Sequence, residues 1–282
     1  MEKIYAVFIS VIGISLGICC VIISVNNLII APDLRTKLIS ISVSIIILVL
    51  SRCLPIYIRP DYAIDMGFIG YFAIGLIMGP YLTTAIVLLS SFFLVVPSPG
   101  PGKKFEHIFN TAPIKTAFNF ANSSISVFIG GKVFIWTGGV AGVLTLPGTL
   151  FPAMAMVITI FLINSILLNI LFKLHLGAPL FASVIKYCID FLPSVFAAAP
   201  IGYFIAMFMS MKSGEYLVIL FILPLLLTRF AFTLYIETKR NYYIVLKTLT
   251  YSIEAKDEYT RGHSERVEKY AKIIAKEMHF SH

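Results

Sequence analysis

The sequence predicts an all-α membrane protein, a polytopic bundle of seven or eight transmembrane helices followed by a short soluble helical segment. Three observations predict this class. Hydrophobic residues make up 59% of the 282-residue chain, charged residues only 13%, and the mean hydropathy is +0.92, unlike a soluble domain. Apolar runs long enough to cross a bilayer recur up to residue 236. Beyond that point the chain becomes polar, because residues 237–282 hold 9 of the 22 Lys and Arg.

The apolar runs define the expected spans in order. A helix needs about 20 apolar residues to cross the hydrocarbon core, because each residue advances it by roughly 1.5 Å. The first run follows one lysine and lacks a small-residue cleavage site, so we expect a transmembrane helix rather than a cleaved signal peptide. The predicted spans are Ile4–Ile30, Leu38–Leu54, Tyr62–Met78, Tyr81–Val96, Thr116–Trp136, Thr149–Phe172, Lys186–Met211 and Tyr216–Ile236. Only Gly79-Pro80 separates the short third and fourth runs, which are either two crossings or a re-entrant pair.

The placement of basic residues predicts a cell-membrane protein with both termini in the cytoplasm. Short cytoplasmic loops carry an excess of Lys and Arg, and an even number of spans places both ends on one side. The predicted inner connections carry Lys3, Arg52, Arg59, Lys103, Lys104, Lys115, Lys173 and Lys186. The predicted outer connections carry Arg35, Lys37 and Lys212. Lys132 fits this pattern least well, and we expect its stem to snorkel from the outer end of its helix.

Asp190 is the ionisable residue that stands out within the apolar runs, because a charge at membrane depth is costly and often functional. Lys186 lies one helical turn before it, which is the spacing of an ion pair. Asp190 is therefore either a ligand or proton site, or half of a neutralised pair at an interface. Asn119 and Asn122 are further candidates, since amides in a span either bind a ligand or hydrogen-bond between helices.

Past Ile236 the pattern changes to a charged amphipathic helix over residues 237–256, in which Tyr242, Leu246 and Leu249 line one face. We expect this signalling helix to continue the last span and to pair two copies of the chain as a homodimer. Gly262 then interrupts the helical pattern. A second helix follows, with an apolar stripe at Val267, Tyr270, Ala271, Ile274, Ala275 and Met278.

His263 begins this second helix, and its spacing alone does not make it a metal ligand, because metal sites need several ligands together. The surrounding run EAKDEYTRGHSERV, from Glu254 to Val267, and the later residues Tyr270, Ala271 and 274–277 (IAKE) resemble the N-terminal edge of HD-GYP domains. These domains are metal-dependent phosphodiesterases that hydrolyse cyclic di-GMP. The resemblance covers about a tenth of the chain.

The resemblance implies three parts: a membrane sensor domain over residues 1–236, a linker over 237–256, and the start of an HD-type domain over 257–282. It implies that His263 is the first ligand of a centre of two divalent metals, iron or manganese. Tyr259 stands where one branch of the family has a glutamate for a third metal, so the two-metal form is implied.

The resemblance also implies a truncated output domain. The His-Asp pair, the later histidines, the lysine and the Gly-Tyr-Pro loop of the family would follow His282. One imidazole cannot hold a dinuclear centre, so we expect no cofactor and no phosphodiesterase activity in this chain alone, and cyclic di-GMP as a partner only of the intact protein. The chain is then either a fragment of a longer protein or a naturally short product.

The sequence thus predicts the sensory input of a bacterial signalling protein whose intact output is an HD-GYP phosphodiesterase. A transporter-like protein that binds a small ligand within the bundle is the alternative, suggested by Asp190, the asparagines and prolines such as Pro193. A sensor kinase with His263 as phosphoacceptor is disfavoured, because no proline follows the Gly-His-Ser-Glu-Arg-Val run. The basic residues lie singly along the loops, so the lipid bilayer and not nucleic acid is the expected surface partner.

Overall fold

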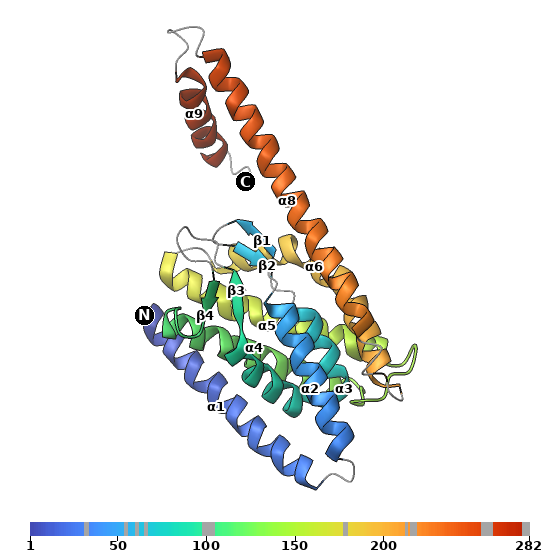
Figure 1. The fold of residues 1–282 in the computed structure, drawn as a ribbon. Helices are drawn as coiled ribbons and strands as arrows, with labels where there is room; N and C mark the ends of the chain where they lie inside the picture. The colour runs from blue at the N-terminus through green and yellow to red at the C-terminus, as the bar shows by residue number, and fades with distance from the viewer. Residues whose placement is uncertain are drawn as a thin grey trace. The chain divides into compact units, whose positions relative to one another are not determined.

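The computed structural model describes residues 1–30, 34–53, 56–59, 62–64, 67–97, 105–176, 180–211, 214, 219–254 and 262–277. These residues are mainly helical, as the sequence predicts (Figure 1). The chain forms two compact units, Met1–Arg229 (the membrane unit) and Phe230–His282 (the tail unit).

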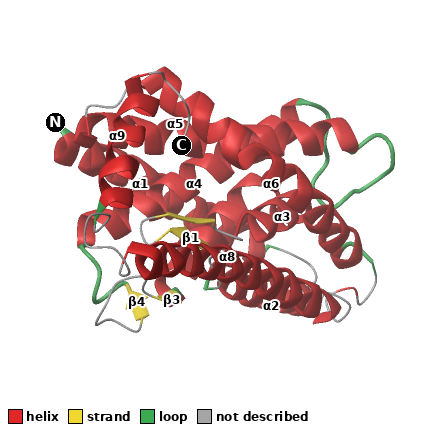
Figure 2. Ribbon diagram, turned by 90° about the horizontal axis from the view of Figure 1, so that it is seen from above, coloured by secondary structure: helices red, strands yellow, loops and turns green. Residues whose placement is uncertain are grey.

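The membrane unit consists of long helices and two short pairs of antiparallel strands (Figure 2). Its helices are α1 (Glu2–Ile29), α2 (Leu34–Arg52), α3 (Gly67–Ser90), the 3-10 turn η1 (Ser91–Phe93), α4 (Pro113–Trp136), α5 (Leu150–Leu176), α6 (Leu180–Met209) and the first part of α8 (Ile219–Glu254). Its strands are β1 (Ile56–Arg59), which pairs with β2 (Tyr62–Ile64), and β3 (Val95–Pro97), which pairs with β4 (Phe105–His107).

Among the described residues, four helical segments are long and apolar enough to cross a membrane when only length and composition are considered: Glu2–Ile29, Leu34–Arg52, Gly67–Phe93 and Leu150–His175. Three of them match predicted spans in position. Helices α4, α6 and α8 lie where the other spans are predicted, and their crossing stays a prediction. The predicted span Tyr62–Met78 was wrong at its start, because Tyr62–Ile64 is strand β2 and the helix begins at Gly67.

Helix α3 folds back on itself at Gly79. This residue has φ 72°, a conformation that a residue with a Cβ adopts only with strain. A Cβ built on Gly75 lies 3.9 Å from Cγ2 of Thr83, although eight residues of straight helix would separate them by about 12 Å. Each half of α3 is about 17 to 18 Å long, too short for a hydrocarbon core of about 30 Å. This geometry favours the re-entrant alternative.

Arg52 joins the two halves of α3. Its Nη1 donates a hydrogen bond to Oγ of Ser91, just after the second half, at 2.6 Å. Its guanidinium carbon lies 5.4 Å from the ring centroid of Tyr71, in the first half. The sequence placed Arg52 in an inner loop, whereas it is the last residue of α2 and is only 7% exposed. Its burial is explained by these two partners, since a buried charge needs hydrogen bonds or ring contacts.

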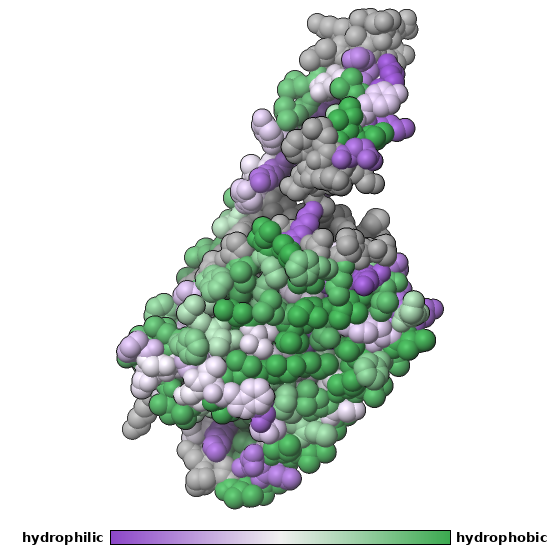
Figure 3. All heavy atoms as spheres, turned by 180° about the vertical axis from the view of Figure 1, so that it is seen from behind, coloured by the Kyte–Doolittle hydropathy of each residue, from purple (hydrophilic) through white to green (hydrophobic). Residues whose placement is uncertain are grey.

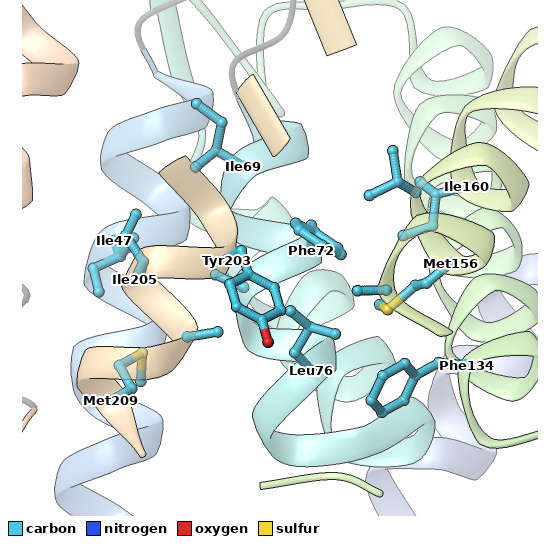
Figure 4. Packing of buried hydrophobic residues seen from close by; sticks show 14 residues of the cluster. Ile47, Ile69, Phe72, Leu76, Phe134, Met156, Ile160, Tyr203, Ile205 and Met209 are labelled. Carbon is cyan, nitrogen blue, oxygen red and sulfur yellow. The ribbon is translucent and has the colours of Figure 1, made fainter. Parts of the chain in front are cut away.

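The largest buried cluster lies where α2, α3, α4, α5 and α6 meet. Figure 4 shows its side chains converging from these helices, with Phe72 and Leu76 of α3 facing Met156 of α5 and Phe134 of α4. Helices α4 and α5 approach closely in this cluster because Gly130 has no side chain, and a Cβ on it would lie 2.4 Å from Cγ1 of Ile160. The re-entrant helix therefore lies in the interior of the unit rather than at its edge.

The outer surface of the membrane unit is largely apolar, as Figure 3 shows for one face. Large side chains stand exposed along α1 and α5, including Ile4, Phe8, Val11, Phe151 and Met154. Soluble monomers rarely expose continuous apolar surface of this kind. In the interior, buried hydroxyls donate to backbone carbonyls of their own helix, as Ser51 does to Ile47 and Thr84 to Pro80. Both features suit a lipid environment, where backbone and side-chain polar groups must be paired internally.

The tail unit contains the remainder of α8 and helix α9 (His263–Glu277). The apolar residues of the predicted stripe on α9 are exposed at Val267, Tyr270 and Ile274, while Met278 lies outside the described residues. Leu246 and Leu249 of α8 are also exposed. Within the described part of this unit, each helix therefore presents an apolar face to solvent.

Helix α1 crosses α4 at very short range through Gly13. A Cβ on Gly13 would lie 2.5 Å from both Cα and Cβ of Ala121. Four residues later, a Cβ on Gly17 would lie 2.7 Å from Cδ2 of Leu88, the end of a flexible side chain. Small residues four apart are a common device for packing helices in membranes.

We expect Gly13→Ala to destabilise the membrane unit by about 1 to 3 kcal/mol, because the Ala121 backbone cannot move away from the added methyl group. Gly17→Ala is the matched control and should be nearly neutral, because Leu88 can change rotamer. Reversible unfolding in mixed micelles with increasing sodium dodecyl sulfate measures both. Equal losses for the two variants would contradict this assignment of the α1–α4 contact.

Candidate functional site

His263 is the first residue of α9 and is exposed. Gly262 before it has φ 71°, which fits the predicted interruption of the helical pattern. The backbone N–H of Arg266 donates to the carbonyl of Gly262 at 3.2 Å and opens the new helix. Tyr259 lies outside the described residues. In the part of the chain that is described, no group of three or more His, Cys, Asp or Glu side chains lies close enough to hold a metal ion.

A hydrogen bond connects α8 to α9 in the tail unit, because the Tyr251 hydroxyl donates to Oε1 of Glu265 at 2.7 Å. The Lys247 ammonium lies 5.4 Å from the centroid of the Tyr251 ring. Its interaction with Tyr251 is the main reason that the pKa of Lys247 is raised. Tyr251 thus holds the start of α9, two residues after His263, against α8.

The Glu268 and Lys272 side chains form an ion pair on the exposed face of α9, four residues apart. The hydrogen bond from Lys272 lowers the pKa of Glu268. Such a pair is typical of the solvated face of an amphipathic helix.

The candidates within the membrane unit belong to two helices, α6 and α4. Asp190 lies in α6, and its side chain is outside what the structure describes. Asn119 is exposed on α4, whereas Asn122 is 4% exposed and its carbonyl and amide oxygens accept from Oγ of Ser126 at 2.7 and 3.4 Å. These contacts of Asn122 lie within its own helix, and a role in ligand binding or in bonding between helices stays a prediction.

The break in α3 is completed by the loop between α4 and α5. Pro80 has no N–H, so the carbonyl of Leu76, four residues earlier, lacks its helical donor. The N–H of Gly142 supplies this bond at 3.0 Å. Gly142 has φ 80°, and a Cβ there would lie 3.4 Å from the carbonyl oxygen of Ile77. On the other side, Gly131 lets α4 approach Pro80, because a Cβ on it would lie 3.0 Å from the Pro80 Cα.

A cavity of about 380 Å³ lies beside this break, where α1 ends and α2 begins. Its polar lining comes from three helices. The lining residues are Ser24, Asn27, Leu28, Lys37, Ser40, Ile41, Ile77, Met78, Pro80, Tyr81 and Leu82. Neither Asn119 nor Asn122 is among them. Volumes of this size are typical of small-molecule sites in proteins.

Lys132 stands behind one wall of the cavity. Its Nζ donates to the Tyr81 hydroxyl oxygen at 2.8 Å and lies 4.4 Å from the Tyr81 ring centroid. The Phe128 ring lies 5.5 Å from the same Nζ. The expectation from sequence was a snorkelling lysine, and the half-buried ammonium instead has a phenol and two aromatic faces as partners.

Sequence reasoning missed this cavity. Two signals for it were present in the sequence: Gly79-Pro80 between two short apolar runs, and Lys132, which fitted the charge rule least well. Neither signal predicts that Ser24 and Lys37 meet Tyr81, because that meeting depends on the packing of three helices far apart in the chain.

No protein-family model, no curated protein and no solved structure matches this chain.

We expect Tyr251→Phe to return the pKa of Lys247 toward the ordinary lysine value and to speed amide hydrogen exchange at the start of α9. The raised pKa means that this interaction stabilises the fold fully below the ordinary lysine pKa and is lost as the pH rises through the raised value. Nitrogen-15 NMR titration of lysine side chains and hydrogen exchange measure the two effects. Tyr242→Phe, on the same exposed helix, is the control and should change neither.

Proposed function

We propose that this chain is the membrane-embedded input and signalling helix of a sensor whose output is an HD-GYP phosphodiesterase acting on cyclic di-GMP. The observation that carries the proposal is the run around His263 and its position. The resembling sequence begins at the end of α8, and its histidine is the first residue of α9, directly after the left-handed Gly262. The membrane unit before it has the apolar surface of an embedded domain.

The exposed apolar face of α9 supports the same proposal. Val267, Tyr270 and Ile274 are 50%, 62% and 58% exposed, which is costly for a helix that is amphipathic. In an HD-type domain this face would pack against later helices. The exposed Leu246 and Leu249 of α8 support pairing of two copies through the signalling helix, the homodimer that the sequence predicts.

The metal centre of the proposed output is not assembled from the described residues. His263 would supply one imidazole, and the described side chains offer no cluster of further ligands around it. A catalytic dinuclear centre lowers the pKa of its bound water and clamps phosphate oxygens, and both tasks need several ligands. The residues described here therefore do not fit the metals by themselves, and no catalytic step is assigned to them.

We expect the protein translated from the complete gene, including any codons after His282, to hydrolyse cyclic di-GMP with manganese or iron present. His263→Ala should lower its turnover at least about 100-fold, because loss of a metal ligand disrupts the centre. His175→Ala is the control, since this exposed histidine pairs with Glu2 in the membrane unit, 2.8 Å away, and turnover should be unchanged. A reading frame without a His-Asp pair in about the next 100 to 200 residues would contradict the proposal.

Helix α8 supports a route for the signal, because the division between the two units falls inside it, between Arg229 and Phe230. Two alanines inserted after Lys239 turn the following residues by about 200°, whereas four turn them by about 400°, nearly back into phase. We expect the two-residue insertion to change cyclic di-GMP turnover of the complete protein strongly and the four-residue insertion to change it little. Equal turnover in both proteins would contradict coupling through the phase of this helix.

A further inference from the structure

We propose that the cavity beside the α3 break binds an amphipathic monoanion, a small carboxylate or similar head carrying an apolar chain. The cavity is bordered by α1, α2 and α3, and its residues all belong to the membrane unit. Occupancy of the cavity does not depend on the proposed function, whereas its role as the signal of a sensor rests on it.

The charge of the lining selects an anion. Among the described residues that line the cavity, Lys37 is the only ionisable side chain apart from the Tyr81 phenol, and none is a carboxylate. No hydrogen bond or ion pair engages the Lys37 ammonium among the described residues, so it is available to a ligand. One lysine is a point charge and suits a monoanion, whereas phosphate dianions are usually held by arginine forks or several backbone N–H groups.

Ser24 is one of three described serines, with Ser124 and Ser165, whose buried Oγ is unpaired, and of these it is the one that lines the cavity. Its side chain is only 6% exposed, and its Oγ has no hydrogen-bond partner in the described structure. Most other buried hydroxyls of the membrane unit, such as Ser10 and Ser44, donate to a carbonyl four residues earlier. A buried hydroxyl that bonds to nothing is destabilising. A ligand oxygen in the cavity would satisfy it.

Tyr81 is prepared to donate a hydrogen bond. Lys132 donates to the phenol oxygen, so the Tyr81 O–H hydrogen is available for another acceptor. The positive charge of Lys132 also strengthens the phenol as a donor. Tyr81 lines the cavity, as does the Asn27 amide. The polar groups are thus arranged to receive an acceptor-rich, negatively charged head.

The rest of the lining is apolar and suits a short hydrocarbon chain. Leu28, Ile41, Ile77, Met78 and Leu82 supply it, and methionine adapts to chains of different shape. An oxyanion head on an apolar chain therefore matches the lining better than a polar metabolite such as a sugar. Such a molecule can come from water, as a medium-chain carboxylate, or from the bilayer, as an anionic lipid.

The test measures binding of sodium octanoate by calorimetry to the full chain in phosphatidylcholine nanodiscs, with empty nanodiscs as the blank. We expect octanoate to bind at least about tenfold more tightly than octan-1-ol, which has the same chain without the charge. Lys37→Gln should weaken octanoate binding by about tenfold or more, and Ser24→Ala and Tyr81→Phe each by about two- to tenfold.

Arg35→Gln is the matched control, because Arg35 is an exposed basic residue of the same helix that does not line the cavity. Octanoate affinity should be unchanged in this variant. The proposal is overturned if octanoate and octan-1-ol bind equally, if Lys37→Gln binds as tightly as the unmodified chain, or if Arg35→Gln is weakened as much as Lys37→Gln. Lys37 is exposed, and the unfolding transition of each variant shows that its fold is retained.

Nanodiscs with part of the lipid replaced by phosphatidylglycerol distinguish the two sources. A Lys37-dependent fall in octanoate affinity there supports an anionic lipid as the occupant, and an unchanged affinity supports a water-soluble carboxylate. Binding is read from this chain without any output activity. Failure of octanoate binding therefore overturns the cavity assignment alone, whereas loss of cyclic di-GMP hydrolysis concerns only the proposed output.

Discussion

One missing hydrogen-bond donor shapes the membrane unit. Pro80 leaves the carbonyl of Leu76 without its helical partner, and an unpaired carbonyl is expensive where water is excluded. The chain meets this requirement with the N–H of Gly142, which holds the loop between α4 and α5 against the turn of α3. The left-handed Gly79 completes the turn, and the residues around it border a polar cavity together with residues of α1 and α2.

The sequence predicted the class of this protein and the positions of most helices, because long apolar runs are a strong and local signal. It also predicted the helix start near His263 from one glycine. It failed at residues 62–64, where a short apolar stretch forms strand β2, since periodicity alone does not separate short strands from helix ends. It also placed Arg52 in a loop, because a charged residue at the end of an apolar run usually marks the end of a membrane span.

The cavity was beyond the reach of sequence for a different reason. Ser24, Lys37 and Tyr81 are ordinary residues at the ends of their runs, and only tertiary packing brings them to one place. The asparagines of α4 drew attention because amides are rare in spans, yet Asn122 is bonded to Ser126 within its own helix. An amide that is unusual for a membrane span is thus a weaker indication of a binding site than a buried polar group without a hydrogen-bond partner, such as Oγ of Ser24.

Arg52 gives the re-entrant helix an asymmetry. Its bond to Ser91 and its contact with Tyr71 fasten the open end of the hairpin to α2. At the opposite end, the Gly142 N–H bonds to the Leu76 carbonyl and Lys132 of α4 bonds to the Tyr81 hydroxyl. Arg52 therefore links both halves of α3 to α2 at the open end, so a change in the position of α2 there acts on both halves of the hairpin rather than on one.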